Sequence, residues 1–109
     1  MTILNSTRLL RYVELIGTTV HNVTNPNVWE DWDLSLLIPV GAVAVEIRIE
    51  NAQNYPGGVR TNGSALVRYV SNSDTDNLCV MVGVGIDRII EVYSGTNDER
   101  DFYLEGYWI

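Results

Sequence analysis

Lysine is absent from this chain of 109 residues, and all seven of its basic residues are arginine. Fourteen acidic residues give a net charge of −7, which opposes a grip on nucleic acid phosphates and predicts no nucleic-acid partner. The single cysteine, Cys79, excludes an internal disulfide and any zinc site built from several cysteines. Apolar runs fall far short of the roughly 20 residues that span a bilayer. Because no basic-then-apolar leader opens the chain either, we expect no membrane segment and no secretory signal.

Amphipathic helix signals are also missing, because no stretch repeats apolar residues at three- and four-residue spacing. Valine, isoleucine and threonine together make 31 of the 109 residues, and these branched side chains favour strands. The apolar fraction of 46% excludes a disordered chain. The length is that of one domain, and no linker or internal repeat interrupts it, so we expect a single domain over residues 1–109.

Two-residue alternation marks the clearest strands, because successive side chains of a strand point to opposite faces. Val45, Ile47 and Ile49 alternate with Glu46 and Arg48 in this way. The expected strands are 9–20, 33–38, 43–50, 65–70, 78–84, 88–93 and 102–107. The segment 78–84 is almost wholly apolar and is expected to be a central strand. The segment 86–88 is expected to be a short hairpin link between its two neighbours.

Turn signals rich in glycine, proline and asparagine separate these runs, for example at 25–27, 55–58 and 94–97. Seven or eight short strands with a turn every dozen or so residues predict an all-β fold, a single antiparallel β-sandwich of the jelly-roll kind. A closed barrel is the alternative.

The ingredients of a hydrolytic triad are poorly represented. His21 is the only histidine and lies in a polar stretch, so we expect it to be an exposed loop residue. The chain has no GxSxG nucleophile motif. Cys79 lies in an apolar run and is expected to be an inert buried thiol. We therefore predict that the protein is not an enzyme and that it uses no cofactor.

Acidic residues gather in two clusters, which are Glu30, Asp31, Asp33 and Asp98, Glu99, Asp101. Neighbouring acids on a strand point to opposite faces, so neither cluster alone forms the facing pair of a glycosidase. We expect solvated loops and edges here. The segments 74–77 and 97–99 offer oxygen donors for calcium, but neither matches the twelve-residue calcium loop, and we predict no metal site.

Tryptophan residues suggest a second kind of site. Trp29 and Trp32 flank two acids, and exposed aromatic rings beside carboxylates can stack on sugars and bond their hydroxyls. We favour the interpretation that Trp29 or Trp32 packs in the core or at a subunit interface. Trp108 is the penultimate residue, and we expect the chain to end in a paired strand.

Four segments carry a family resemblance. They are 39–45 (PVGAVAV), 58–68 (GVRTNGSALVR), 82–93 (VGVGIDRIIEVY) and 101–108 (DFYLEGYW). Over roughly residues 36–109 this succession resembles small β-sandwich domains of tailed-phage and related virion proteins. Similar closing motifs also occur in repeated sandwich domains of bacterial surface proteins. The resemblance implies the fold and a building or attachment role, and it carries over no catalytic residue.

A virion structural protein is the function that the resemblance implies, in particular a capsid decoration protein. Such a protein is made in the host cytoplasm, lies on the particle exterior, and binds the major capsid protein, other virion proteins or sister subunits. We expect a homo-oligomer and favour a trimer, because cyclic symmetry closes sandwich edges. The alternative is a carbohydrate-binding or host-surface attachment module. The candidate interface or ligand face consists of Trp29, Trp32, Tyr55, Arg60 and Arg68, although Arg60 and Arg68 fit a role in tying loops within the domain better.

Overall fold

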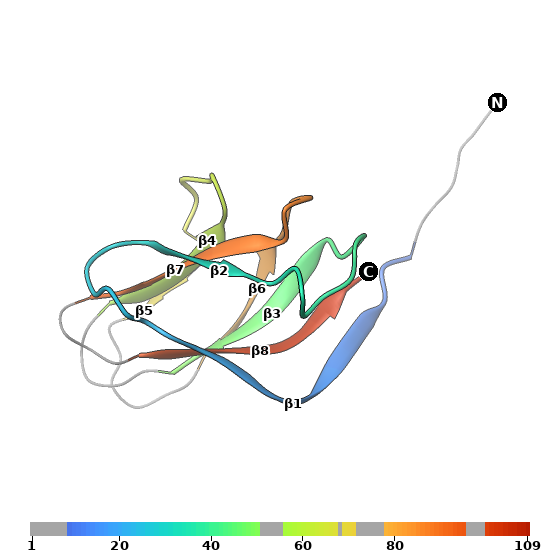
Figure 1. The fold of residues 1–109 in the computed structure, drawn as a ribbon, viewed down its shortest axis with the longest axis horizontal. Helices are drawn as coiled ribbons and strands as arrows, with labels where there is room; N and C mark the ends of the chain where they lie inside the picture. The colour runs from blue at the N-terminus through green and yellow to red at the C-terminus, as the bar shows by residue number, and fades with distance from the viewer. Residues whose placement is uncertain (1–8, 51–55, 68, 72–77, 96–99) are drawn as a thin grey trace.

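The computed structural model describes residues 9–50, 56–67, 69–71, 78–95 and 100–109. Eight strands form two four-stranded sheets that pack face to face, as the sequence predicts (Figure 1). The strands are β1 (Tyr12–Asn22), β2 (Glu30–Asp33), β3 (Ala44–Ile49), β4 (Gly57–Thr61), β5 (Tyr69–Ser71), β6 (Leu78–Gly83), β7 (Ile89–Ser94) and β8 (Asp101–Trp108). The described residues contain no helix with the length and apolar character that a membrane crossing needs.

The strand order is that of a jelly roll. The first sheet has the order β1-β8-β3-β6, and the second has the order β2-β7-β4-β5. The first strand therefore pairs with the eighth, the second with the seventh, the third with the sixth and the fourth with the fifth, all antiparallel. Successive pairs alternate between the two sheets, which is the double-sheet winding of jelly rolls.

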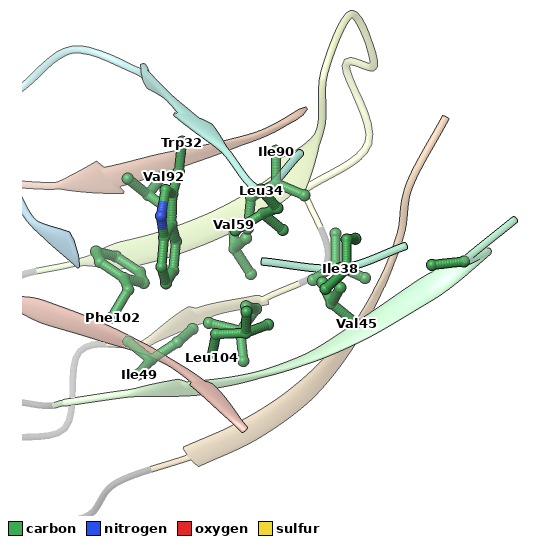
Figure 2. Packing of buried hydrophobic residues seen from close by; sticks show 13 residues of the cluster. Trp32, Leu34, Ile38, Val45, Ile49, Val59, Ile90, Val92, Phe102 and Leu104 are labelled. Carbon is green, nitrogen blue, oxygen red and sulfur yellow. The ribbon is translucent and has the colours of Figure 1, made fainter. Parts of the chain in front are cut away.

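The core fills the space between the sheets, and alternation in the sequence explains its membership (Figure 2). Val45, Ile47 and Ile49 of β3 are fully buried, and Phe102 and Leu104 of β8 meet them from the neighbouring strand. The remaining members of the core are Trp32, Leu34, Ile38, Ala42, Val59, Val82, Ile90 and Val92. β8 ends at Trp108, so the expected paired strand near the end of the chain is confirmed.

The strand expected at 33–38 is wrong. β2 ends at Asp33, whose side-chain Oδ1 accepts a bond from the Ser35 amide at 2.9 Å and starts a turn. The amides of Leu37 and Ile38 then both donate to the Leu34 carbonyl. This single turn buries Leu34 and Ile38 and leaves Leu36 on the outside. Apolar residues at every second position, as at Leu34, Leu36 and Ile38, therefore fit a turn as well as a strand.

The expectations for 78–88 are also corrected. β6 is an edge strand and not a central one, because it pairs with β3 alone. Cys79 is consequently exposed rather than buried. Residues 86–88 do not form the expected hairpin link, since β6 and β7 belong to different sheets. An apolar run shows that a segment is strand-like, but its pairing partners decide whether it lies at the centre or at the edge.

Two further expected strands have different bounds from those predicted. β1 starts at Tyr12 and extends to Asn22, so Leu9 and Leu10 precede it and are exposed. In the segment 65–70, strand pairing begins only at Tyr69, and residues 65–67 belong to the preceding loop. Val43 lies just before β3 and is exposed, unlike the alternate residues that follow it.

Candidate interaction surface

Three loops meet at one end of the sandwich because of the jelly-roll winding. They connect β2 to β3 (34–43), β4 to β5 (described over 62–67) and β6 to β7 (84–88) (Figure 1). The loops contact one another directly: the Asn62 side chain donates to Asp87 Oδ2 at 2.8 Å, and the Leu34 amide donates to the Arg88 carbonyl at 2.8 Å. Residues that lie up to 54 positions apart in the chain, as Leu34 and Arg88 do, therefore share one surface.

This end of the molecule exposes aliphatic side chains, and we call it the apolar end. Leu36, Val40 and Ile86 are 97%, 80% and 99% exposed. Val43, Leu66 and Val67 complete the set and are also exposed. Single exposed aliphatic residues are ordinary, but several on adjoining loops make this end a candidate interaction surface.

A groove of about 450 Å³ runs between two of these loops. Its lining consists of Val40, Gly41, Ala42, Val43, Val84, Gly85, Ile86 and Arg88. The lining is apolar apart from Arg88, whose guanidinium Nη1 donates to the carbonyls of Ser35 and Ile38, each at 2.9 Å. The groove therefore suits an apolar group better than a charged ligand.

Arg88 holds the β2–β3 loop against the β6–β7 loop. Besides its two bonds to carbonyls, its backbone has φ = 56°, a left-handed conformation that closes the turn before β7. Asp87 strengthens the same turn, because its Oδ1 accepts from the Ile89 amide at 3.1 Å. The hydrogen bond from Asn62, followed by the one from Ile89, lowers the pKa of Asp87. The exposed aliphatic residues are thus carried on loops that hydrogen bonds hold in place.

The structure brings together only some of the residues of the interface or ligand face that the sequence predicts. Trp32 lies in the core and is 7% exposed, with its ring between the two sheets (Figure 2). Trp29 is half-buried, and its ring centroid lies 5.3 Å from that of Tyr93. Tyr55 and Arg68 lie outside the described residues. The structure therefore separates Trp29 from Trp32, since one packs outside a sheet and the other inside.

Arg60 ties strands together within the domain, as the sequence favours. Its Nε donates to Glu91 Oε1 at 2.5 Å, and its guanidinium carbon lies 4.1 Å from the Trp29 ring centroid. The cation therefore covers one face of the indole ring, in a cation–π contact. Arg60 therefore occupies a ring face on which a sugar would stack.

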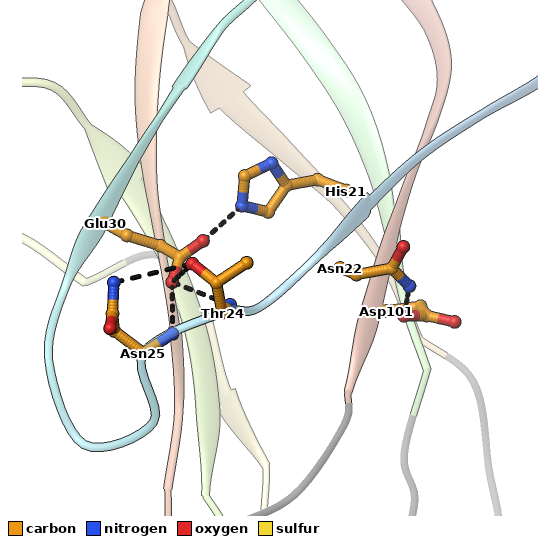
Figure 3. A network of polar contacts seen from close by, with 6 residues as sticks. All are labelled: His21, Asn22, Thr24, Asn25, Glu30 and Asp101. Atoms are coloured by element: carbon orange, nitrogen blue, oxygen red, sulfur yellow. Dashed lines mark hydrogen bonds and ion pairs between the residues drawn. The ribbon is translucent and has the colours of Figure 1, made fainter.

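His21 is not an exposed loop residue, which corrects the expectation. It belongs to β1, is half-buried, and packs 5.3 Å from the Trp32 ring. Its Nε2 lies 2.5 Å from Glu30 Oε2 (Figure 3). The alternation that predicts strands is weak in this stretch, because polar residues occupy both faces.

Glu30 is the centre of a polar network at this margin of the sandwich (Figure 3). Its Oε1 accepts from the backbone amides of Thr24 and Asn25, each at 3.0 Å. Partial burial raises the pKa of Glu30, but the bonds from Asn25, His21 and Thr24 outweigh burial, and the net pKa is lowered. Glu30 is therefore a structural carboxylate rather than the solvated one expected from the sequence.

Metal candidates are limited. Within the part of the chain that the structure describes, no group of three or more histidine, cysteine, aspartate or glutamate side chains is placed to hold a metal ion. The two segments considered for calcium, 74–77 and 97–99, lie outside the described residues. Asp101 of the second acidic cluster bonds the Asn22 side chain of the neighbouring strand.

Leu36, Ile86 and Arg88 belong to this surface but were not predicted from the sequence. Ile86 carried a usable signal, because it is a large aliphatic residue between Gly85 and Asp87 in a turn. Leu36 and Arg88 carried none, since the first resembled a strand residue and the second meets its partners only in the fold. Comparisons with known protein families, curated proteins and solved structures find no match to this chain.

Proposed function

We propose that the protein is a non-enzymatic structural protein of a virus particle that decorates the outside of a capsid. It binds the capsid shell or sister subunits through the apolar end. The observation that carries this proposal is the display of Leu36, Val40 and Ile86 on loops that Arg88 and Asp87 hold in place.

The energetics of this surface support a binding role. Covering one exposed leucine or isoleucine stabilises a contact by about 1.5–3 kcal/mol. Association also costs free energy when flexible loops must become ordered. The bonds from Arg88 to two carbonyls reduce that cost, because the β2–β3 loop is already held in one arrangement.

Architecture and charge are compatible with the same role. Double-sheet jelly rolls occur in viral capsid proteins and in lectins, so the strand order alone is an analogy and assigns no function. The resemblance of four sequence segments to virion sandwich domains points to the first of these classes. The net charge of −7 fits a protein that lies away from packaged nucleic acid.

The carbohydrate-binding alternative is less well supported by the described surface. It relied on Trp29 and Trp32 as one face, whereas Trp32 is in the core and Arg60 lies over the Trp29 ring. An attachment role through other residues remains a prediction, and a glycan array with the wild-type protein tests it.

Virus particles isolated from the organism that encodes this protein test the proposal. Electron cryo-microscopy of these particles is expected to show copies of the sandwich bound by its apolar end. Purified protein is then added back to particles that lack it. We expect Ile86→Ser to weaken binding at least about tenfold, as loss of a central apolar contact does.

Ile16→Ser is the matched control, because Ile16 on β1 is as exposed as Ile86 and lies outside the apolar end. It should bind particles like the wild type. Particles that carry no copies of the protein, or equal losses from both substitutions, would refute the proposal.

A further inference from the structure

Each sheet has two edge strands, and three of the four are protected against pairing with another chain. β1 pairs with β8 through a register shift between Glu14 and Thr19, where Gly17 has φ = 92°. β2 has only four residues and three of them are acidic. β5 has three residues. Bulges, charges and shortness are the usual devices that keep a sheet edge from associating.

β6 has none of these devices. Its six residues, LCVMVG, include no charge and no proline, and its ladder with β3 has no irregularity. Cys79 and Met81 point outward from the sheet, and Met81 is 60% exposed. A regular, uncharged edge of this length is a template for another strand.

Hydrogen-bond alternation shows which backbone groups of β6 face the open edge. The Val84 amide donates to the Val43 carbonyl at 3.0 Å, in line with the β3–β6 register. In an antiparallel ladder the bonding direction alternates along the strand, so Leu78, Val80 and Val82 also bond to β3. The amides and carbonyls of Cys79, Met81 and Gly83 then face away from it.

The Gly83 carbonyl already has a partner, because Thr61 Oγ1 of β4 donates to it at 2.7 Å. Within the described residues this leaves the Gly83 amide turned to the open edge, together with the amides and carbonyls of Cys79 and Met81. Their spacing of two residues is that of one antiparallel pairing unit.

We propose that β6 pairs antiparallel with β6 of a second copy of this chain, around a two-fold axis at Val80. Cys79 then lies opposite Met81 of the second copy, and the two residues exchange backbone hydrogen bonds on both sides of the axis. This register uses the amides and carbonyls of Cys79 and Met81 in each chain and leaves the bond from Thr61 to Gly83 intact. The contact is isologous, because the same patch serves both copies.

The charges nearest to the paired edges do not oppose this register. In the β3–β6 ladder Arg48 lies opposite Cys79, and Glu46 lies opposite Met81. Both side chains lie one strand back from the edge, where Arg48 bonds Glu105 and Glu46 accepts from Tyr12 of the same chain. The register rests on the backbone groups, because with Cys79 opposite Cys79 the open groups of Met81 would not meet those of Cys79 or Met81 on the second copy.

The size of the contact predicts a weak dimer. A short strand pair covers less than the roughly 800 Å² per partner of a typical stable interface. We expect dimers at high protein concentration, or where copies are crowded on a surface. The two-fold contact is a physical reason to prefer a dimer to the trimer expected from the sequence. It does not depend on the apolar end or on the proposed capsid role.

Sedimentation equilibrium over a range of protein concentrations tests the pairing. The wild type is expected to show a monomer–dimer equilibrium. Met81→Pro removes an amide that faces the open edge, and we expect it to weaken dimerisation at least about tenfold. Met81→Ala keeps that amide and should change dimerisation by less than about threefold. A monomeric wild type, or equal losses in both variants, would overturn the proposal.

Disulfide cross-linking of the Met81→Cys variant is a second test, which holds even where proline disturbs folding. Cys79 and the new thiol on the second copy face each other within disulfide range, so mild oxidation by oxidised glutathione should give covalent dimers. In the wild type, Cys79 of one copy lies two positions along the strand from Cys79 of the second copy, so these two thiols should not cross-link. Ile16→Cys on the bulged edge should not cross-link either. Absence of dimers from the Met81→Cys variant, or equal cross-linking of the wild type, would overturn the proposed register.

Discussion

Trp29 and Trp32 are only three positions apart, yet their side chains lie in different environments. Trp32 of β2 faces the core, whereas Trp29 precedes the strand and packs against Tyr93 and Arg60 on the outside of the same sheet. His21 contacts the Trp32 ring from β1, so this indole also joins the two sheets. The two side chains are chemically identical, and we expect their contributions to stability to differ because they differ in burial and in contacts.

We expect Trp32→Ala to lower the free energy of unfolding by about 3–5 kcal/mol, because it empties a large volume in the core. Trp29→Ala should cost only about 1–2 kcal/mol, through the lost ring and cation–π contacts. Denaturant unfolding followed by circular dichroism measures both values. Similar losses from the two substitutions would show that Trp29 is as important to the packing as Trp32.

At the scale of elements, the close approach of β1 to β8 depends on one glycine. Gly106 lies opposite Glu14 of β1, and a Cβ placed on it would come 2.6 Å from the Val13 carbonyl oxygen and closer still to the Tyr12 ring. The Tyr12 hydroxyl donates to Glu46 at 2.8 Å. Desolvation, and then the bond to Glu46, raises the pKa of Tyr12 to about 12, so the hydroxyl stays a donor.

Gly106→Ala is therefore expected to destabilise the fold by about 1–3 kcal/mol, since the backbone of β1 must move away. Gly85→Ala is the control, because its added Cβ meets only Asp87 Oδ1, at an ordinary 3.6 Å. Thermal unfolding compares the two variants. A stability of the Gly106→Ala variant equal to that of the control would mean that β1 tolerates the displacement.

The elements also show where prediction from sequence succeeds. β3 and β8 were predicted because side chains alternate in character along both, and buried residues alternate with half-buried ones from Val45 to Ile49 and from Asp101 to Gly106. The segment 33–38 was predicted wrongly, because the bond from Ser35 to Asp33 that starts its turn competes with the strand pattern. The edge position of β6 was not predictable, since an apolar run has the same composition at the centre and at the edge of a sheet.

At the scale of the whole molecule, polar contacts join the two sheets at both margins of the sandwich. His21 of β1 contacts Glu30 of β2 at one margin, and Thr61 of β4 bonds Gly83 of β6 at the other (Figure 3 shows the first). The Glu30 carboxylate, with 13% of its side chain exposed, combines three neighbours in one site. This margin is therefore sensitive to pH.

The pKa of Glu30 lies below its ordinary value of 4.5, so ionisation favours the folded state. This stabilisation is complete above about pH 4.5 and is lost as the pH falls through the lowered pKa. We expect Glu30→Gln to cost about 1–3 kcal/mol at neutral pH and to flatten the acid side of the stability profile. Thermal unfolding as a function of pH measures this.

Glu14→Gln is the control for this prediction, because it removes an equal charge from an exposed position on β1. It should keep the acid slope of the wild type. An unchanged slope in the Glu30→Gln variant would show that other carboxylates account for the acid sensitivity.

The sequence by itself determined the all-β class, the alternating residues that β3 and β8 bury, and the acidic, lysine-free composition. These properties are local, because alternation and composition act on neighbouring positions of one chain. Only the tertiary structure decided that Leu36, Val40 and Ile86 share one end, that Trp32 and Trp29 separate, and that β6 lies at an edge. These outcomes depend on pairing between strands that are distant in the chain, and the winding of the two sheets determines that pairing.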